Sequence, residues 1–502
     1  MTPEEVLREA GLGDPQAELL TFLRRQRWFS GRERELQAIE IVDAGTDGED
    51  PLLVPVLVDA IYGDGGRERY SIPLSVRPAE RAIETDVGLV AMGTRNGAPV
   101  EVVDALIDPE AAVRFWDLMT TNGEIATAAG RIRGQSEPGV AAAPPEPVAD
   151  GAAGIHPLGR DQSNSSLVRD KRELLKFFRK IEQSSSPELE MLQALHHAGF
   201  TGIAAPMGRV DYRQGDGEEA LLAILQPYLH NATDGFQMAM TSLRDLYSVA
   251  EDATHADPLG IREAIDEQGS DFTPEANRLG AIVGEMHLTL ASDRMPEQMR
   301  PVLATAEMMQ AWAGEMEADL ERLFADHADR TQGLARDQLA ASFQALKEVE
   351  GGGLAVRYHG DLHLGQLVRT DAGWTILDFE GEPSRSVEVR RRRSSPLRDA
   401  AGMLRSFSYA AAVALMERAT PKDPDWEHLL AYGDAWAEVN RAVFWDAYVG
   451  AVGATGLLPD ADAVGTVLRA FEVQKAIYEF GYELGHRPDL AWVPLRALRQ
   501  LR

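Results

Sequence analysis

The chain has no cysteine among its 502 residues. Disulfides, thiolate nucleophiles and cysteine-based zinc sites are therefore excluded, and nothing points to an oxidising compartment. Basic side chains are scarce beside acidic ones, with 50 Lys and Arg against 80 Asp and Glu, so the formal net charge is −30. Such a chain repels nucleic acid and anionic membranes, and we expect neither as a partner.

Long hydrophobic runs are also missing. The longest obvious run, at residues 409–416, is far shorter than the roughly 20 apolar residues that a membrane-spanning helix needs. The N-terminal stretch MTPEEVLREAGLGDP lacks the basic segment and apolar core of a signal peptide, so we expect a cytoplasmic protein. With 44% apolar residues the chain is globular, and at roughly 150 residues per domain its length suggests two to four units.

The pattern of the chain changes twice along its length. Residues 51–62 and 67–77 read as strands joined by Gly-Asp-Gly-Gly, which predicts a hairpin. Residues 137–154 are rich in Ala, Pro and Gly and favour a flexible linker. Short strands with one helix follow, and from residue 234 onward helical patterns dominate. The sequence thus predicts a β-rich part followed by a large helical part.

One segment places polar groups where an apolar core is expected. Residues 358–383 read YHGDLHLGQLVRTDAGWTILDFEGEP. A turn at TDAGW folds the segment back, so that Asp361 on a loop can approach Gln366 and Asp378. Phosphoryl transfer needs such a set, in which a carboxylate orients the acceptor hydroxyl and hard oxygens hold Mg²⁺. Each residue alone would suit a buried polar hairpin or a structural His-Asp pair, whereas the whole string favours phosphoryl transfer.

The motifs HGDLHLGQ and LDFEGEP resemble the catalytic and metal-binding loops of aminoglycoside phosphotransferase-like kinases, and most closely those of actinobacterial maltokinases. The resemblance covers nearly the full chain, through RWFSGR, DQSNSSLV, LLKFFRK, LQPYLHNATDG, SPLRDAAGMLRSFSYAA and QKAIYEFGYELGHRP. It implies that Asp361 is the catalytic base and that Gln366 and Asp378 are the Mg²⁺ ligands. Glu380 would be an acidic neighbour on the substrate side.

The resemblance also implies a fold. We expect an α+β, bilobal, eukaryotic-protein-kinase-like architecture with three parts. Residues 1–105 would form an N-terminal cap domain. Residues 106–226 would comprise an intermediate segment and a β-rich N-lobe that binds ATP. Residues 227–502 would form a helical C-lobe with the catalytic and sugar-binding groups.

A kinase needs a cation on the nucleotide phosphates. Lys176 is the best candidate, because a lone Lys between Leu175 and Phe177 must either extend to solvent or meet an anion. An outward-facing Lys on an edge strand is the plainer alternative. Glu190, in the helix that begins near Pro187, is the expected ion-pair partner, and Glu188 is its rival.

Two further stretches complete the expected nucleotide site. In GRDQSNSSL, the side chains and turn amides of Ser163, Asn164 and Ser165 could bind phosphate in place of a glycine-rich loop. LQPYLH would be the hinge between lobes, with backbone groups of Gln226 and Tyr228 meeting adenine. The alternative for this stretch is an ordinary connection between a strand and a helix.

Sugar sites combine aromatic rings with carboxylates and amides. In the C-terminal helices, Gln474 and Tyr478 share one helical face and Glu479 lies beside them. Aromatic stripes at this spacing commonly form core, but the polar neighbours favour a sugar site. The expected substrate contacts are His363, Glu380, Trp436, Asn440, Gln474, Tyr478, Glu479 and Glu483.

Several residues are assigned supporting roles. His359 and His363 should fix the catalytic loop, and Asp399 should hydrogen-bond this loop from behind. His287 should pack in the core with a satisfied ring nitrogen. Residues 390–393, four successive arginines, favour a solvated loop that pairs with acidic surface groups.

By resemblance, the reaction would be phosphorylation of maltose to maltose 1-phosphate by ATP and Mg²⁺, feeding glycogen or α-glucan synthesis. Maltokinases commonly carry an acidic residue at the position of Gln474, and glucosamine kinases share the same loops. Phosphorylation of glucosamine to glucosamine 6-phosphate is therefore the alternative. An aminoglycoside-modifying enzyme and a regulatory pseudokinase are further alternatives. The partners would be a small sugar and another glucan-pathway enzyme, with the chain as a monomer or homodimer.

Overall fold

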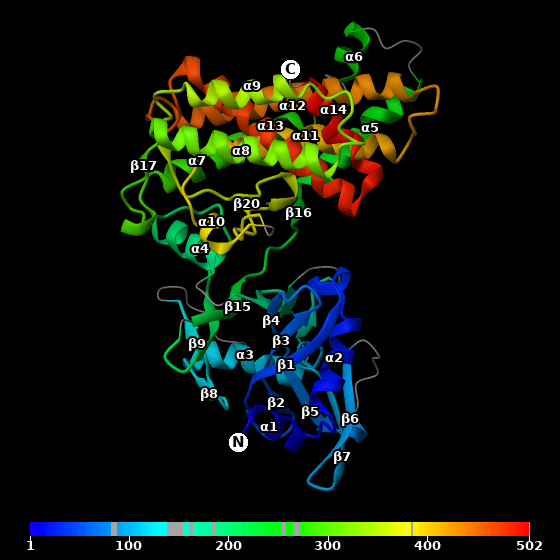
Figure 1. Cartoon of the computed structure of the whole chain (residues 1–502), viewed down its shortest axis with the longest axis vertical. Helices are drawn as coiled ribbons and strands as arrows, with labels where there is room; N and C mark the ends of the chain where they lie inside the picture. Colours follow the sequence, from blue (N-terminus) through cyan, green and yellow to red (C-terminus); the bar gives the residue numbers. More distant parts are fainter. Residues whose placement is uncertain are drawn as a thin grey trace. The chain divides into compact units, whose positions relative to one another are not determined.

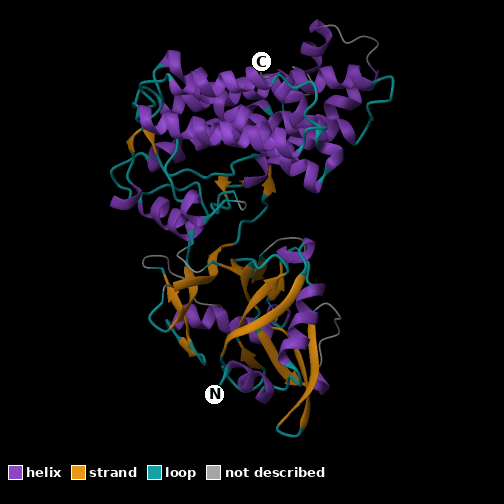
Figure 2. Cartoon of the chain, in the orientation of Figure 1, coloured by secondary structure: helices purple, strands orange, loops and turns teal. Residues whose placement is uncertain are grey.

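The computed structural model describes residues 1–81, 88–137, 154–159, 164–182, 186–217, 219–252, 258–265, 271–382 and 385–500. The linker expected at residues 137–154 falls almost wholly outside these ranges. The chain forms two compact units, the first made of Met1–Glu190 with Ala204–His230 and the second of Met191–Ile203 with Asn231–Arg502. Strands predominate in the first unit and helices in the second (Figure 2).

The N-terminal part of the first unit carries two antiparallel sheets. Helices α1 (Pro3–Glu9) and α2 (Pro15–Arg25) precede them, and their apolar faces enter the same core as the strands. The predicted hairpin is confirmed as β3 and β4 (Figure 1). The first sheet has the order β1 (Leu36–Ala44), β3 (Val56–Tyr62), β4 (Arg67–Ser71), β13 (Lys180–Ile181), and the second has β2 (Leu52–Val54), β5 (Leu74–Pro78), β7 (Ala98–Asp104), β6 (Leu89–Arg95).

The remaining strands of this unit form a seven-stranded antiparallel sheet. Helix α3 (Pro109–Thr121) begins at the side-chain cap of Asp108 and ends at Asn122 in the left-handed conformation. Phe115 and Trp116 of α3 are buried in one core with the sheet. The strand order is β10 (Ile155–Pro157), β11 (Ser165–Arg169), β12 (Glu173–Phe177), β15 (Glu219–Pro227), β14 (Gly208–Gln214), β9 (Gly130–Ser136), β8 (Glu124–Ala126).

Arg179 joins the seven-stranded sheet to the N-terminal sheets. Its guanidinium is buried, donates to Asp104 at 2.5 Å and lies 4.6 Å from the ring centroid of Trp28. Its Nε also donates to the hydroxyl of Ser165 at the start of β11, at 2.8 Å. Because β13 follows directly and pairs with β4, the strand that carries Lys176 continues into the N-terminal part.

The second unit is a helical assembly. Helix α11 is buried along most of its length and packs against α5, α12 and α13. Helices α7 and α12 approach closely at Gly280, where any side chain would collide with the backbone of Phe444. The helices are α4 (Pro187–His197, which begins in the first unit), α5 (Gly235–Asp252), α6 (Pro258–Ala264), α7 (Thr273–Leu290), α8 (Ala306–Asp326), α9 (Arg336–Lys347), α10 (Val387–Arg390), α11 (Leu397–Met416), α12 (Trp426–Val452), α13 (Ala461–His486) and α14 (Trp492–Gln500).

Short strands in this unit carry the polar segment. β18 (Leu354–Ala355) pairs with β17 (Val302–Leu303), and β19 (Leu367–Thr370) pairs with both β16 (Thr233–Asp234) and β20 (Gly373–Ile376). The hairpin of β19 and β20 confirms the predicted turn, with Gly373 at a φ of 132°. Among the residues that the structure describes, none of the helices combines the length and apolar character needed to cross a membrane.

Candidate active site

The loop before β19 is held from behind by Asp399. This carboxylate, near the start of α11, accepts the backbone N–H of His359 at 2.7 Å and of Gly360 at 2.9 Å. His287 contacts Asp399 through Nε2 at 3.2 Å and the hydroxyl of Tyr448 through Nδ1 at 3.0 Å. Burial opposes the charge of Asp399, but its hydrogen bond with His287 and the charge of that ring hold its pKa below the ordinary value. The supporting roles predicted for Asp399 and His287 are confirmed.

His359 fixes the same loop from within. Its Nε2 lies 2.7 Å from the carbonyl oxygen of Leu377, and its Nδ1 accepts the backbone N–H of Asp361 at 3.3 Å. Since Leu377 follows β20, this ring ties the loop to the hairpin. The predicted role of His359 is confirmed, and Asp361 is presented on a loop fixed at several points.

The carboxylate of Asp361 meets a residue that the sequence analysis did not single out. Lys475 of α13 donates to Asp361 Oδ1 at 2.9 Å. Its ammonium also lies 3.9 Å from Glu382 Oε1 and 5.0 Å from the ring centroid of Tyr478. Burial opposes ionisation of Asp361, but the charge of Lys475 holds its pKa below the ordinary value. The carboxylate of Asp361 is therefore ionised and able to accept a hydrogen bond or a proton.

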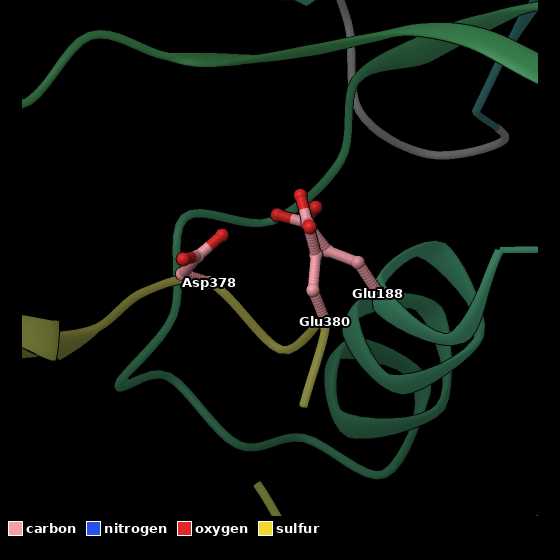
Figure 3. A group of neighbouring side chains, drawn as sticks. All are labelled: Glu188, Asp378 and Glu380. Atoms are coloured by element: carbon pink, nitrogen blue, oxygen red, sulfur yellow. The ribbon is translucent and has the colours of Figure 1, made fainter. Parts of the chain in front are cut away.

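Gln366 and Asp378 are brought together by the hairpin. The side-chain amide of Gln366 donates to Asp378 Oδ2 at 3.2 Å, and the backbone carbonyl oxygen of Gln366 accepts the backbone N–H of Leu377 at 2.8 Å. Asp378 adopts a φ of 64°, a conformation that is unfavourable for a residue with a side chain. Figure 3 shows the side chains of Asp378 and Glu380 extending to the same side of the segment that joins them.

This pair of residues suits a hard cation. A half-turn of the Gln366 amide would direct its oxygen, in place of its nitrogen, toward Asp378. A carboxylate and an amide oxygen at adjacent positions are the donor types that Mg²⁺ prefers. The donor chemistry therefore fits the metal that the sequence led us to expect.

In the first unit, Lys176 lies in β12 between β11 and β15. Its ammonium donates to Glu188 at 2.8 Å, and the side chain of Glu188 is only 3% exposed. Glu188 stands in the first turn of α4 (Figure 3). The prediction that Glu190 pairs with Lys176 is wrong, and its rival Glu188 is the partner. Glu188 and Glu190 lie two positions apart, a rotation of about 200° around the helix, so their side chains leave opposite faces.

Comparisons with known proteins identify proteins that are similar to this chain. The maltokinase N-terminal cap domain family matches residues 22–108. A glucosamine kinase from Mycolicibacterium smegmatis is 28% identical over 359 residues, which cover 70% of this chain and 80% of the relative. A glucosamine kinase from Streptacidiphilus jiangxiensis is 26% identical over 352 residues, which cover 68% and 72%.

Solved structures of similar shape are also glucosamine kinases. One, in complex with glucosamine, ADP and inorganic phosphate, has a TM-score of 0.61 at 21% identity and covers 93% of this chain and 94% of the other. A second crystal form has a TM-score of 0.63 at 21% identity, with 95% and 96% covered. The chain is thus similar to glucosamine kinases over most of its length, and its residues 22–108 match the maltokinase cap family. The predicted α+β kinase-like fold with a large helical C-terminal part is confirmed.

The acceptor residues expected for this family separate into two groups. Gln474 and Tyr478 line a small cavity of about 20 Å³ together with Gly360 and Lys475. Gln474 donates to Asp319 of α8 at 3.0 Å. These positions on α13 lie beside the catalytic loop, where an acceptor hydroxyl would have to approach Asp361.

Two larger cavities adjoin this small one. A cavity of about 340 Å³ shares Gly360, Glu382 and Arg385 with it and adds the rings of Trp312 and Tyr358. Another of about 440 Å³ shares Arg385 and Tyr478 and adds, among others, Asp319 and Tyr482. Both larger cavities therefore share lining residues with the small cavity, and the one of about 340 Å³ also reaches Tyr358 and Gly360 of the loop.

The expectation that Trp436 and Asn440 contact a sugar is corrected. Both side chains are fully buried in α12, where Trp436 donates to Ser242 at 3.1 Å and Asn440 donates to the carbonyl of Trp436 at 2.9 Å. The indole packs against Phe272 and Phe407. Because both side chains are fully buried in the helical core, they are not accessible to a bound sugar.

Glu479 and Glu483 are also directed elsewhere. Glu479 accepts from Arg405 Nε at 2.8 Å, and Glu483 accepts from the hydroxyl of Tyr409 and from Arg487. Arg405 and Tyr409 belong to α11, so these carboxylates join α13 to α11. Each carboxylate already accepts hydrogen bonds from other side chains of the protein, which argues against the expected contact with a sugar.

On the nucleotide side, Ser163 lies outside the described residues, and Asn164 and Ser165 flank the gap. The backbone N–H of Tyr228 donates to the carbonyl oxygen of Arg172 at 2.8 Å, so this one group is already bonded within the protein. Gln226 pairs with Leu174 in the strand ladder, and its side chain donates to Ala204 at 2.8 Å. β15 thus includes this stretch as far as Pro227, and residues 228–230 follow the strand.

The remaining residues serve the loops. His363 Nδ1 accepts the N–H of Gly365 at 3.1 Å, and burial lowers the pKa of this imidazole. The carbonyl oxygen of Glu380 accepts from Arg390 at 2.9 Å, and Arg392 pairs with Glu315 at 3.0 Å. The arginine run therefore braces the segment after β20 and the acidic surface, as expected.

Proposed function

We propose that the chain is an ATP-dependent sugar kinase in which Asp361 accepts the proton of the sugar hydroxyl. Gln366 and Asp378 would hold Mg²⁺, and Lys176 would bind nucleotide phosphates with Glu188 fixing its position. The observation that carries this proposal is the segment 358–383, which presents an ionised Asp361 and a Gln366–Asp378 pair from one rigid loop and hairpin. The ADP bound in a solved relative supports ATP as the phosphoryl donor.

The chain's own residues would contribute orientation and charge. Asp399 and His359 hold the loop, so that little conformational freedom remains to be lost when the hydroxyl binds. Asp361 then takes the proton as the oxygen attacks phosphorus. Bound Mg²⁺ would neutralise charge on the phosphates during transfer. The N-terminal cap at residues 1–105, the N-lobe to residue 226 and the helical lobe from residue 227 form our proposed division of labour.

Glucosamine is the acceptor that the site favours. Its ammonium group needs a carboxylate partner, and both Asp319 and Glu382 line cavities next to the catalytic loop. Asp319 also accepts from Gln474, the position where maltokinases commonly carry an acidic residue. The curated relatives, which match over about two thirds of the chain, are glucosamine kinases and support this choice.

Maltose is the second candidate. The family match of the N-terminal cap is to maltokinases. Trp312 and Tyr358 line the cavity of about 340 Å³ and could support a second ring against their faces. Both sugars therefore belong in the same assay.

The test is an ATP-consumption screen over glucosamine, maltose, glucose and N-acetylglucosamine with Mg²⁺, with products identified by mass and phosphorus NMR. We expect glucosamine 6-phosphate as the main product. A higher kcat/KM on maltose, with phosphate on the anomeric oxygen, would replace glucosamine by maltose. Nucleotide binding without transfer to any sugar would favour a regulatory pseudokinase and refute the proposal.

Asp361→Asn tests the assigned base. We expect kcat to fall at least 10³-fold, because the amide cannot take the proton, while ADP affinity stays within about threefold. Isothermal titration with ADP and a melting curve serve as controls for folding. A variant that retains wild-type turnover removes Asp361 from the mechanism.

A further inference from the structure

Lys475 contacts the proposed base directly, and its surroundings distinguish it from a surface lysine. The side chain is 15% exposed, and its ammonium is bonded to Asp361 at 2.9 Å. The other groups that face it are Glu382 at 3.9 Å, the ring of Tyr478, and Glu479 on its own helix. Burial would favour the neutral amine, but these carboxylates raise the pKa of Lys475, so it carries its proton throughout the ordinary pH range.

The geometry leaves part of Asp361 accessible. Lys475 occupies Oδ1, and among the described residues Oδ2 receives no hydrogen bond. The Asp361 side chain is 26% exposed, and its neighbour Gly360 lines both the small cavity and the larger one. An acceptor hydroxyl can therefore bind Oδ2 while Lys475 stays on Oδ1.

We propose that Lys475 is a catalytic residue that binds the phosphoryl group during its transfer to the acceptor. This inference rests on the proposed function. A hydroxyl bound to Asp361 lies roughly 2.7 Å from Oδ2, and the phosphorus that it attacks must lie on the far side of that oxygen from its proton. The flexible stem of Lys475 lets its ammonium bridge Oδ1 and a phosphoryl oxygen at this point.

The step balances as follows. The acceptor oxygen forms a bond to phosphorus, and the bond from phosphorus to the bridging oxygen of ADP breaks, with its electron pair leaving on ADP. The hydroxyl proton passes to Asp361 and then to solvent. Lys475 keeps its proton and offsets the charge of the equatorial phosphoryl oxygens, as cations do in other phosphoryl transfers. Helix α13 thus supplies a cation on the acceptor side, in addition to the one that Lys176 would supply on the nucleotide.

A purely structural role makes a different prediction. If Lys475 only orients or ionises Asp361, it has no contact with phosphorus, and mimics of the transferring group would bind equally well without it. If it binds the phosphoryl group, its loss must weaken those mimics more than it weakens ADP. Binding therefore separates the two roles without relying on turnover.

The experiment compares Lys475→Met, which keeps the length of the stem, with Lys475→Arg, which keeps the charge. Lys347→Met is the matched control, since Lys347 of α9 pairs with Glu317 at 2.7 Å away from the catalytic loop. Affinities are measured by calorimetry for ADP with Mg²⁺, and for ADP with Mg²⁺, tetrafluoroaluminate and the preferred sugar. Melting curves establish that each variant is folded.

For Lys475→Met we expect binding of the tetrafluoroaluminate complex to weaken about 100-fold and kcat to fall by 10²–10³-fold. ADP affinity and the sugar KM should stay within about threefold, and Lys475→Arg should recover part of the loss. A folded Lys475→Met that binds the tetrafluoroaluminate complex like wild type, or that changes only the sugar KM, overturns the inference. A wild-type chain that phosphorylates no sugar refutes the proposed function instead.

Discussion

Two lysine–carboxylate pairs, one in each unit, have nearly the same length and differ in what surrounds the carboxylate. Lys176 and Glu188 lie 2.8 Å apart, with side chains 14% and 3% exposed. Lys475 and Asp361 lie 2.9 Å apart, with side chains 15% and 26% exposed. The lysines are covered alike, but Glu188 is enclosed and Asp361 is open. One pair is built to fix a cation, and the other leaves an anion approachable.

The difference follows from the elements that carry the pairs. Lys176 stands on a strand between two others and Glu188 on the first turn of a helix, and both side chains are largely buried. Asp361 stands on a loop, which exposes it but requires support from Asp399 and His359. A group that must meet a substrate gains access on a loop, and the order of that loop then depends on buried groups behind it.

Asp399→Asn should have the largest effect, because it loosens the loop that carries Asp361 and leaves the Lys176–Glu188 pair unchanged. The NH₂ group of the new amide would face the backbone N–H of His359 or Gly360, two donors without an acceptor between them. The buried contact with His287 would also weaken, so the free energy of unfolding should fall by about 3 kcal/mol. We expect kcat to fall about 100-fold while ADP affinity is nearly unchanged. Urea unfolding and ADP titration check both parts. An equal loss of ADP affinity would mean that the loop does not act separately from the nucleotide side.

Glu188→Gln and Glu190→Gln sharpen the assignment of the first pair. Removing the charge of Glu188 leaves Lys176 without its enclosed partner, so kcat/KM for ATP should fall by roughly 10- to 50-fold. Glu190→Gln, the matched control from the same helix turn, should change it less than about threefold. Steady-state kinetics with varied ATP decide between them, and the reverse ranking would restore Glu190.

The pH profile gives the smallest expected effect. Lys475, with His363 and His359, lowers the pKa of Asp361 against the opposing influence of burial. In Lys475→Met the largest of these favourable charges is gone, so the pKa of Asp361 rises and the acid limb of kcat/KM moves toward higher pH. Profiles of wild type and variant on one sugar measure the shift. An unmoved acid limb would assign it to another group, such as a substrate phosphate.

The hairpins and the catalytic segment could be predicted from the sequence because their signals are local. The turn at Gly373 determines that Gln366 and Asp378 meet, and Lys176, the lone lysine in an apolar strand, does meet an anion, Glu188. The sequence alone does not distinguish Glu188 from Glu190, because the face that a helix turns toward a sheet depends on the residue at which the helix begins.

The acceptor side could not be predicted as well, since it depends on how long helices pack. Trp436 and Asn440 are residue types that sugar sites use, but α12 buries both, and the Trp436 ring packs against Phe272 and Phe407. Glu479 pairs with Arg405, which is distant in the sequence, and Glu483 pairs with Arg487, four positions further along the chain. Lys475 did leave a signal, a single cation between Val473 and Ile477 in an apolar helix, like the one that identified Lys176.

Arg179 limits how this architecture can be shortened. A chain that began after Asp104 would lose both that carboxylate and the indole of Trp28, and a buried guanidinium beside β12 would face neither. Leaving such a charge uncompensated costs about 3–5 kcal/mol, a large share of the stability of an ordinary domain. The N-terminal sheets are therefore not a detachable accessory, and recombination that exchanged them between relatives would have to carry the arginine and its two partners together.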